Sequence, residues 1–519
     1  MHLSINACCG EGQLLRRYYA LHRRAPRHAV VGNTRRASLR YNGACSEPDS
    51  TLVTPVVYLQ RFAATLRAQA ADPLSRGWAT VFGGTLARLA LGFVASVLVA
   101  RALGPASFGI YATLGAVSAI GGALADLGLS AAAVRRVAAA WPSDPALARR
   151  RGFAFLMLRA ALAAALALIS LLIAAPLAAL LPGRPPPELV LLALLGVVAT
   201  GLSGAVSALL QATGAFRSLA LVLIANSGLT ALLALALAAA GRLTVATALG
   251  VLGIGTSLVS LALGWRLLPL RRLTNAQRPT PNDQGVTTFV VRRTPRLRLR
   301  ERLRRTSFVA ESRELFRFGG WVWLASGCAM LAAYLDVLLV GRWLPPAAVG
   351  LYALASNLAG KADAINHSLH AVLLPAASRL DNPHAMRGYV RRGLARSAAL
   401  SLLLLPLVLL AGPLIELFYG PAFRPAAGVF QLLLGVAIFD LWATPLVLLA
   451  YPADRPRLLA AGDALRVGVL ATVGAWLIPS LGLSGAALAR LGARVAGAAL
   501  ILAGLRFGHR AGQSRTPGS

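Results

Sequence analysis

The stretch VLVARALGPASFGIYA at residues 97–112 recurs without a gap as LLVGRWLPPAAVGLYA at residues 338–353. The positions shared by both copies include Arg101 and Arg342, Pro105 and Pro346, Gly109 and Gly350, Tyr111 and Tyr352, and Ala112 and Ala353. A second match, between residues 217–220 and 457–460, recurs at nearly the same offset. Each copy of the longer stretch joins two apolar segments. The chain therefore reads as one helical bundle written twice, an organisation found in secondary transporters.

The composition is that of a membrane protein. The chain is 57% hydrophobic and 13% charged, with a mean hydropathy of +0.66, whereas a soluble domain of this length needs more polar surface. Apolar runs of about 20 residues predict spanning helices. We expect twelve, over residues 78–100, 109–131, 152–181, 187–211, 217–240, 244–265, 319–341, 347–375, 397–418, 427–450, 457–479 and 482–505.

The net charge of +34 is unevenly distributed. If the N-terminus is cytoplasmic, nearly all loop arginines fall in cytoplasmic loops, and each opposite loop carries about one. This asymmetry follows the positive-inside rule and predicts that both termini are cytoplasmic. The basic loops are expected to contact anionic membrane lipid. No aromatic-interleaved RNA-binding module is present, so we do not expect nucleic acid as a partner.

The expected fold class is an all-α polytopic membrane protein with two six-helix lobes. Because six is even, both lobes have the same orientation and are related by a pseudo-two-fold axis along the membrane normal, with a cleft between them. The expected domains are a basic cytoplasmic tail with an interfacial helix (1–77), an N-terminal lobe (78–265), a basic cytoplasmic linker (266–318), a C-terminal lobe (319–505) and a cytoplasmic tail (506–519).

The tail at 1–77 has three readings that the sequence leaves open. It is a disordered cytoplasmic segment, translation upstream of a misassigned start, or a transit-like presequence. The four cysteines lack metal-ligand spacing, and no P-loop is present, so no metal and no cofactor are predicted. Every outer loop is short, which leaves no room for a catalytic domain there. An enzyme is therefore not expected.

Several segments resemble a known family. They are 97–112, 336–377, Asp126-Leu-Gly-Leu-Ser, Tyr451-Pro-Ala-Asp-Arg-Pro and Gly482-Leu-Ser-Gly-Ala. The chain is similar to the polysaccharide-export family of the multidrug/oligosaccharidyl-lipid/polysaccharide flippase superfamily, which includes the Wzx-type O-antigen flippases. The matching motifs are structural turns, so they indicate the family and not the glycan.

The resemblance implies a specific activity and place in the cell. A polyprenyl-diphosphate-linked oligosaccharide would be flipped from the inner to the outer leaflet of a bacterial inner membrane. The product would serve lipopolysaccharide, O-antigen or exopolysaccharide synthesis, with polysaccharide polymerase and chain-length proteins as further partners.

The repeated turn has a physical reading of its own. Its proline cannot continue a helix, and Gly109 and Gly350 allow close approach where the next helix begins. Tyr111 and Tyr352 suit the interfacial aromatic belt. The arginine of each copy is expected to reach lipid headgroups.

Basic residues within the apolar segments are candidates for substrate binding. An ionisable side chain in hydrocarbon costs about 2.5–3.5 kcal/mol or more, so it should face the bundle interior. Arginines near mid-depth can bind a diphosphate with two-pronged hydrogen bonds. Alternatively, they form structural bridges with aspartates of neighbouring helices. The predicted substrate-binding residues are Arg88, Lys361, Arg490 and Arg494.

Acidic and histidine residues are candidates for ion coupling. On the segment 347–375, Asp363, His367 and His370 share one stripe with Ser356, and Asn357, Lys361 and Ser368 form a second stripe. A helix this polar should line a wet cavity. Asp440, Asp336 and Asp126 are further coupling candidates. Equal depth predicts a Lys361–Asp440 pair, and spacing predicts an Asp463–Arg466 pair.

Two rival functions remain open. A drug/cation antiporter of the same superfamily would favour an acidic or aromatic cavity. A non-transporting scaffold of a glycan-assembly complex would have its inward charges paired and dry.

Overall fold

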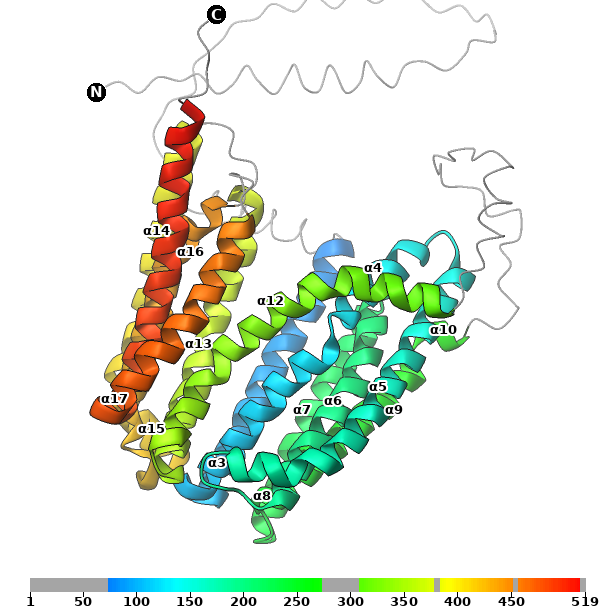
Figure 1. Cartoon of the computed structure of the whole chain (residues 1–519), viewed down its shortest axis with the longest axis horizontal. Helices are drawn as coiled ribbons and strands as arrows, with labels where there is room; N and C mark the ends of the chain where they lie inside the picture. Colours follow the sequence, from blue (N-terminus) through cyan, green and yellow to red (C-terminus); the bar gives the residue numbers. More distant parts are fainter. Residues whose placement is uncertain (1–72, 273–307, 378–382, 451–455, 514–519) are drawn as a thin grey trace, which may run out of the picture. The chain divides into compact units, whose positions relative to one another are not determined.

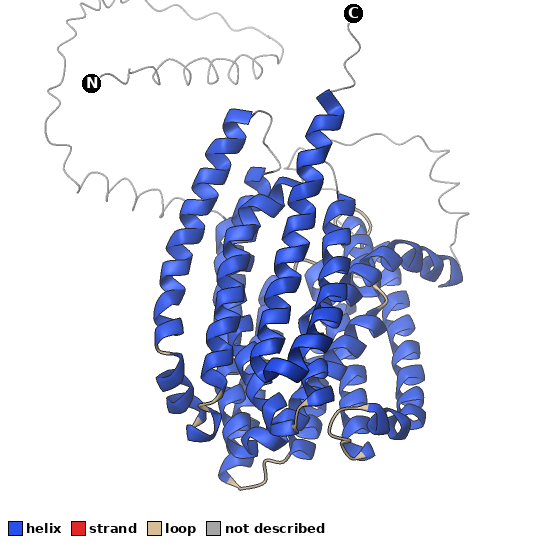
Figure 2. Ribbon diagram, turned by 60° about the vertical axis from the view of Figure 1, so that its left-hand side comes forward, coloured by secondary structure: helices blue, strands red, loops and turns tan. Residues whose placement is uncertain are grey.

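The computed structural model describes residues 73–272, 308–377, 383–450 and 456–513. All of these belong to one compact unit, Gln69–Ser519, and every regular element in these ranges is helical (Figure 2). Most of the predicted tail at 1–77, and the linker from residue 273 to residue 307, lie outside the described residues. The chain is a multi-pass, all-α membrane protein.

The first half contains the helices labelled α3 to α10 (Figure 1). They are α3 (Pro73–Asp126), α4 (Leu129–Ala140), α5 (Pro145–Leu180), α6 (Pro187–Ala212), α7 (Phe216–Ala239), α8 (Val245–Thr247), the π-helical η1 (Ala248–Gly255), α9 (Thr256–Leu267) and α10 (Pro269–Arg272).

The second half continues in the same way. Its helices are α12 (Phe308–Trp343), α13 (Pro346–Ala377), α14 (Pro383–Leu409), α15 (Ala411–Tyr419), the short η2 (Pro421–Phe423), α16 (Ala426–Val447), η3 (Leu448–Ala450) and α17 (Pro456–Gln513).

Nine segments in the described ranges are long and apolar enough to cross a membrane. Two of them, Leu86–Asp126 and Ala461–Leu505, each contain a sharp break, at Gly104 (φ 67°, ψ 171°) and Gly482 (φ 60°, ψ −134°). Each therefore joins two of the segments predicted from the sequence. Helix α13 is not among the nine, and its interior carries the polar stripes noted above. The number twelve stays a prediction.

Local signals set several helix ends. The Asp144 side chain accepts a hydrogen bond from the backbone N–H of Leu147, and Pro145 occupies the first turn of α5. An N-cap carboxylate satisfies a donor that the helix leaves unpaired, and proline is tolerated at that position. Leu127 (φ 51°) and Gly128 (φ 67°) end α3. The two residues together turn the chain into α4, which the sequence had assigned to a loop.

The predicted segment 397–418 was wrong in its limits. Helix α14 begins at Pro383 and ends at Leu409, and α15 follows at Ala411. The arginines between 387 and 396 had suggested a loop. They instead lie on an extension of the helix. A basic helical turn makes the same backbone hydrogen bonds as an apolar one, so the arginines do not end the helix.

The two copies of the repeated turn meet each other. A Cβ atom on Gly109 would overlap the carbonyl oxygen of Pro346, and a Cβ on Gly350 would overlap that of Pro105. The same Cβ atoms would lie 2.9 Å from the Gly350 nitrogen and 3.0 Å from the Gly109 nitrogen. The predicted close approach is therefore present, and it brings α3 against α13.

The largest buried cluster surrounds this crossing. It includes Phe108 of α3, Leu354 of α13 and Phe430 of α16. Tyr352 is fully buried in it, so its predicted place in the interfacial aromatic belt was wrong. Its hydroxyl donates a hydrogen bond to the buried carboxylate of Asp336.

Candidate functional site

Among the residues that the structure describes, at least three ion pairs connect helices in the apolar interior. Each joins an arginine on one helix to an aspartate on another, which satisfies both charges away from bulk water. The pairs are Arg490–Asp336 at 2.8 Å, Arg494–Asp440 at 3.4 Å and Arg159–Asp126 at 3.3 Å.

Asp336 of α12 is the centre of the tightest network. Its side chain is 0% exposed. It accepts hydrogen bonds from the Tyr352 hydroxyl at 2.7 Å and from the backbone N–H of Val337 at 2.8 Å. Arg490 of α17 donates both to Asp336 and, at 2.9 Å, to the Ser356 hydroxyl. Tyr352 and Ser356 are four residues apart on α13, so this network holds three helices together.

A second group of charges lies beside this network in a cleft between α13, α16 and α17. Asp363, Asp440, Arg490 and Arg494 line it, together with small residues such as Gly360. The cleft is narrow: the space between its lining atoms amounts to about 250 Å³ only when the open solvent at its mouth is included. Asp440 is buried. Its carboxylate forms an ion pair with Nε of Arg494 at 3.4 Å, whereas the structure gives Asp363 no hydrogen bond or ion pair among the described residues.

The surroundings of Arg490 and Arg494, two of the predicted substrate-binding residues, are not purely basic. Asp363 and Asp440 line the cleft, and Asp336 contacts Arg490 from outside it. Three carboxylates therefore lie near two guanidinium groups. Both guanidinium groups are paired, as in the alternative reading of structural bridges, and all the lining helices come from the second half of the chain. Their role in binding substrate stays a prediction.

Lys361 does not pair with Asp440, so that prediction was wrong. The Lys361 ammonium group donates to the side-chain oxygen of Asn357, one turn earlier on the same helix. Asp440 binds Arg494 instead. The prediction rested on depth along two helices, and depth alone does not say which way each side chain points.

Arg88 lies apart from this cleft. It is exposed, on the first segment of α3, and forms no ion pair with any residue in the described ranges. Gly84, one turn away, packs against Ala220 of α7, whereas a Cβ on Gly92 would meet nothing within 4 Å. The face that carries Arg88 is therefore packed at one end and open at the other.

The predicted Asp463–Arg466 pair is confirmed. The two side chains lie 2.9 Å apart, three residues from each other on α17. Arg466 also packs closely on Gly497, where an added Cβ would lie 2.5 Å from its Nε atom. This pair lies within one helix, as expected.

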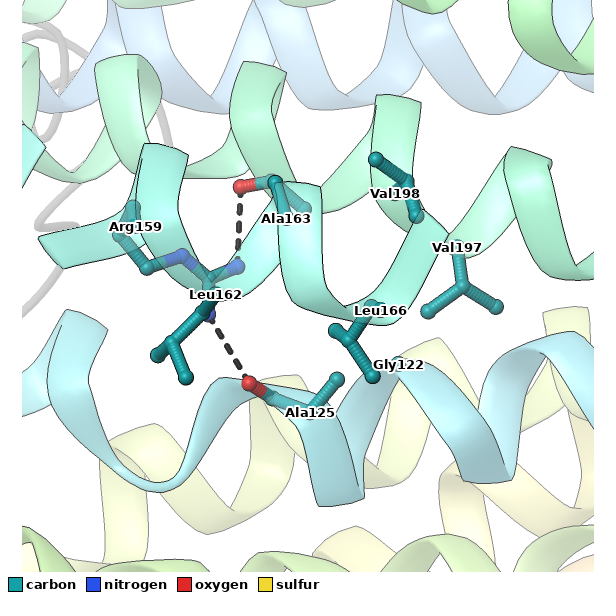
Figure 3. A pocket seen from close by; sticks show the side chains of 9 residues that line it. Gly122, Ala125, Arg159, Leu162, Ala163, Leu166, Val197 and Val198 are labelled. Atoms are coloured by element: carbon teal, nitrogen blue, oxygen red, sulfur yellow. Dashed lines mark hydrogen bonds between the residues drawn. The ribbon is translucent and has the colours of Figure 1, made fainter. Parts of the chain in front are cut away.

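Arg159 and Asp126 form a separate site in the first half. Figure 3 shows Arg159 with its hydrogen bond to Ala125. Arg159 is 7% exposed and donates to the carbonyl oxygens of Ala125 at 3.2 Å and Gly201 at 2.9 Å. Asp126 also accepts from the Ser130 hydroxyl at 2.5 Å. The guanidinium group thus joins α3, α5 and α6, and a small apolar pocket lies beside it.

The histidine candidates are less completely described. The side chain of His367 lies outside the described side chains, and His370 is half-buried on α13. Within the described ranges, no three His, Cys, Asp or Glu residues are grouped to hold a metal ion.

Sequence reasoning missed the partners of these charges. Tyr352 was assigned to the membrane interface, and Ser356 was noted only as part of a stripe. Their spacing of four residues, on a helix that also carries Asn357 and Lys361, was the available signal for a shared polar face.

The comparisons with known proteins agree with this architecture. The family model described as "Polysaccharide biosynthesis protein" matches residues 74–381, whereas no curated protein matches the chain.

Solved structures show the same fold at low identity. One is described as the inward-facing conformation of a multidrug resistance MATE family transporter of the MOP superfamily. It is 16% identical with a TM-score of 0.58, and the match covers 83% of this chain and 99% of that one. Another is the lipid II flippase MurJ in an inward closed conformation. It is 13% identical with a TM-score of 0.59, over 82% of this chain and 87% of that one. The fold is that of MOP-superfamily transporters, and with more than half of its residues matched by the family model, the chain belongs to the polysaccharide biosynthesis protein family.

Proposed function

We propose that the protein is a flippase, not an enzyme, and that its cargo is a polyprenyl-diphosphate-linked oligosaccharide. It would move this lipid from the inner to the outer leaflet of a bacterial inner membrane by alternating access. The family supports a role in polysaccharide synthesis, and the fold supports a transporter. O-antigen, lipopolysaccharide and exopolysaccharide pathways all remain within this proposal, with polymerase and chain-length proteins as neighbours.

The observation that carries the proposal is a pair of basic residues without acidic partners. Arg88 is exposed on an apolar stretch of α3 and Lys361 lies on the polar interior of α13, and neither forms an ion pair within the described part of the chain. A fixed positive charge in a low-dielectric environment is costly unless an anion neutralises it. A diphosphate would supply that anion and would bind a guanidinium group through two hydrogen bonds.

The two basic residues also lie at similar distances along their helices from the repeated turns. Arg88 is about 24 Å along α3 from the break at Gly104, and Lys361 is about 22 Å along α13 from its start at Pro346, at 1.5 Å per residue. Because the two turns meet at Gly109 and Gly350, these lengths start from a common level. One diphosphate between α3 and α13 would then neutralise both charges.

The proposed orientation of the protein in the membrane follows from the distribution of its loop arginines. The arginine-rich loops are proposed to be cytoplasmic, together with both termini. The crossing of the two turns then faces the outer leaflet.

Reconstituted vesicles provide the test. Purified protein is placed in liposomes with a fluorescent prenyl-diphosphate oligosaccharide, and its arrival in the other leaflet is followed by quenching. Arg88→Ala and Lys361→Ala should each reduce flipping at least tenfold, whereas Lys361→Arg should keep most of it. Arg424→Ala is the matched control, because Arg424 is an exposed residue paired with Glu416. Full flipping by both alanine variants would refute the assignment.

A drug/cation antiporter is the second candidate. It is favoured by one observation, the three carboxylates Asp336, Asp363 and Asp440 around the cleft of the second half. In this case, cells that express the protein would gain resistance to cationic dyes, and deletion of the gene would leave surface glycan unchanged. Accumulation of prenyl-diphosphate saccharide on the inner leaflet after deletion would exclude the antiporter.

A further inference from the structure

The end of the bundle that carries the repeated turns, proposed above to face the outer leaflet, contains one arrangement twice. In each, a repeated turn packs against a loop of the other half of the chain. A Cβ atom on Gly341, in the turn between α12 and α13, would lie 2.7 Å from the Cβ of Pro182 in the loop between α5 and α6. In the same contact, a Cβ on Gly183 would lie 3.3 Å from Cγ of Pro346. The turn of the second copy is therefore held closely against the loop of the first half.

The turn of the first copy packs in a corresponding way against the segment that leads from α15 to α16. Phe108 of α3 lies edge-on against Phe423 of η2, with ring centroids 6.0 Å apart. Arg101 of α3 donates a hydrogen bond to the carbonyl oxygen of Leu417 of α15 at 2.5 Å. A turn of one half thus meets a loop of the other half at both places.

The two loops also correspond in sequence. Arg184-Pro185 recurs as Arg424-Pro425 at an offset of 240 residues, which is the offset of the shorter repeat described above. The turns supply Arg101 and Arg342 at equivalent positions. Each arrangement therefore contains one arginine from a turn and one from a loop, so the two can be compared directly.

The two arrangements differ in their charge balance. Arg424 forms an ion pair with Glu416 at 3.3 Å. Arg184 and Arg342 are exposed, and neither has a side-chain hydrogen bond or an ion pair within the part of the chain that the structure describes. Glu188, four residues after Arg184, does not pair with it there. One arrangement thus contains a carboxylate partner, and the other has two arginines without one.

Arg184 also has an unusual backbone conformation. Its φ is 42°, a value that residues with a Cβ rarely adopt, and the proline that follows disfavours helical conformations of the residue before it. Gly183 has a positive φ as well, at 73°. Residues kept in such conformations are concentrated at binding sites, where the surrounding structure fixes the direction of their side chains.

Arg184 and Arg342 are close enough to share a ligand. Because Pro182 contacts Gly341, the Cα atoms of the two arginines are no more than about 17 Å apart at 3.8 Å per residue, a span that two extended arginine side chains and an anion can fill. Two guanidinium groups without a counter-charge repel each other, and an anion between them removes this repulsion. A diphosphate diester carries a negative charge on each phosphate, and its oxygens accept two-pronged hydrogen bonds from guanidinium groups.

We propose that Arg184 and Arg342 form an anion site on the outer face of the protein, and that its ligand is the diphosphate of cargo that has reached the outer leaflet. Both arginines lie outside the apolar segments, so they meet the diphosphate after Arg88 and Lys361 have released it. The identity of the ligand rests on the proposed function, whereas the anion site itself does not.

Protection from a guanidinium reagent tests the site without transport. Purified protein in phosphatidylcholine nanodiscs is treated with phenylglyoxal, and the modification of each arginine is followed by peptide mass spectrometry. Inorganic diphosphate should slow the modification of Arg184 and Arg342 at least threefold, compared with sulfate at equal ionic strength. Arg424 is the matched control and should react at the same rate with either anion. Unchanged rates at Arg184 and Arg342, or equal protection of Arg424, would overturn the site.

Two variants sharpen this measurement. Arg342→Ala should abolish the protection of Arg184, because the anion needs both guanidinium groups. Glu416→Gln removes the carboxylate of the other arrangement, so diphosphate should then protect Arg424. Protection of Arg184 that survives Arg342→Ala would show that the two arginines do not share a ligand.

Nanodiscs that contain phosphatidylglycerol distinguish the two sources of phosphate. They should leave Arg184 and Arg342 as reactive as phosphatidylcholine does when no diphosphate is added. Protection by phosphatidylglycerol alone would assign the site to membrane phospholipid and would refute cargo as its ligand.

Flipping of the fluorescent lipid tests the role in transport. The double variant Arg184→Ala with Arg342→Ala should flip at least threefold more slowly than the wild type, whereas Arg424→Ala should be unaffected. Undiminished flipping by the double variant would refute a role for cargo, even if diphosphate protects the two arginines. A wild-type protein that flips no lipid would refute the proposed function and leave the protection result intact.

Discussion

The carboxylate of Asp336 and the guanidinium group of Arg490 lie 2.8 Å apart, 154 residues from each other in the chain, and the aspartate is completely buried. This pair joins α12 to α17 and, through Tyr352, also to α13. Such a pair contributes little compared with an apolar contact of the same size, but loss of one partner leaves an unpaired buried charge.

Arg490→Ala should therefore destabilise the protein by about 3–5 kcal/mol, which is typical of a broken buried ion pair. Asp336→Ala removes the other partner, and the double variant should be less harmful than the sum of the singles. Thermal unfolding in detergent, followed by tryptophan fluorescence, measures all three. Arg424→Ala at the exposed pair with Glu416 is the control and should change stability by less than about 1 kcal/mol. Additive effects at 336 and 490 would contradict a direct pair.

Asp440 provides a second double-variant test. Arg494→Ala and Asp440→Ala should be non-additive in stability, because their side chains form an ion pair. Lys361→Ala and Asp440→Ala should be additive within about 0.5 kcal/mol, because Lys361 is bound to Asn357. The same unfolding measurement distinguishes the two cases. Coupling between positions 361 and 440 would restore the pairing that the sequence suggested.

Gly201 leaves room for Arg159. A Cβ at Gly201 would lie 2.9 Å from Nη2 of Arg159, and the backbone oxygen of Gly201 accepts from that same atom. Gly201→Ala should displace the guanidinium group from its carbonyl partners and destabilise the protein by about 1–3 kcal/mol, the cost of a buried donor left unpaired. Gly196→Ala on the same helix, with open space around it, is the control and should stabilise slightly. A neutral Gly201→Ala variant would show that the arginine finds other partners.

The helix breaks should depend on glycine. Gly482 has a positive φ of 60° with ψ −134°, a conformation that side chains with a Cβ rarely adopt. Gly482→Ala should therefore cost about 1–3 kcal/mol. Gly435→Ala, in the interior of α16 with nothing within 4 Å of the new methyl group, should gain about 0.5–1 kcal/mol from helix propensity. Equal stability of the two variants would mean that the break tolerates other residues.

The sequence predicted the features that depend on local chemistry. The apolar segments lie within a few residues of α5, α6, α7 and α16, since a spanning helix needs an unbroken apolar run. The repeated turn predicted close approach at Gly109 and Gly350. The Asp463–Arg466 pair followed from its spacing of three residues along one helix.

The rest depends on how helices are rotated about their axes. The predicted depths put Lys361 and Asp440 at the same level. The orientation of α17 about its axis instead points Arg494 toward that aspartate. Tyr352 appeared suited to the interface from its place beside a turn, and the burial of Asp336 beneath it could not be read from either residue alone. Side-chain direction across four helices is a property of packing, so local patterns do not contain it.

The two repeated turns fit against each other reciprocally at Gly109 and Gly350. The space that each glycine leaves empty is filled by the other segment's backbone, so no change of side chain in one can compensate for a bulkier residue in the other. The two glycine positions therefore depend on each other: a side chain at either one would displace the backbone of the other copy.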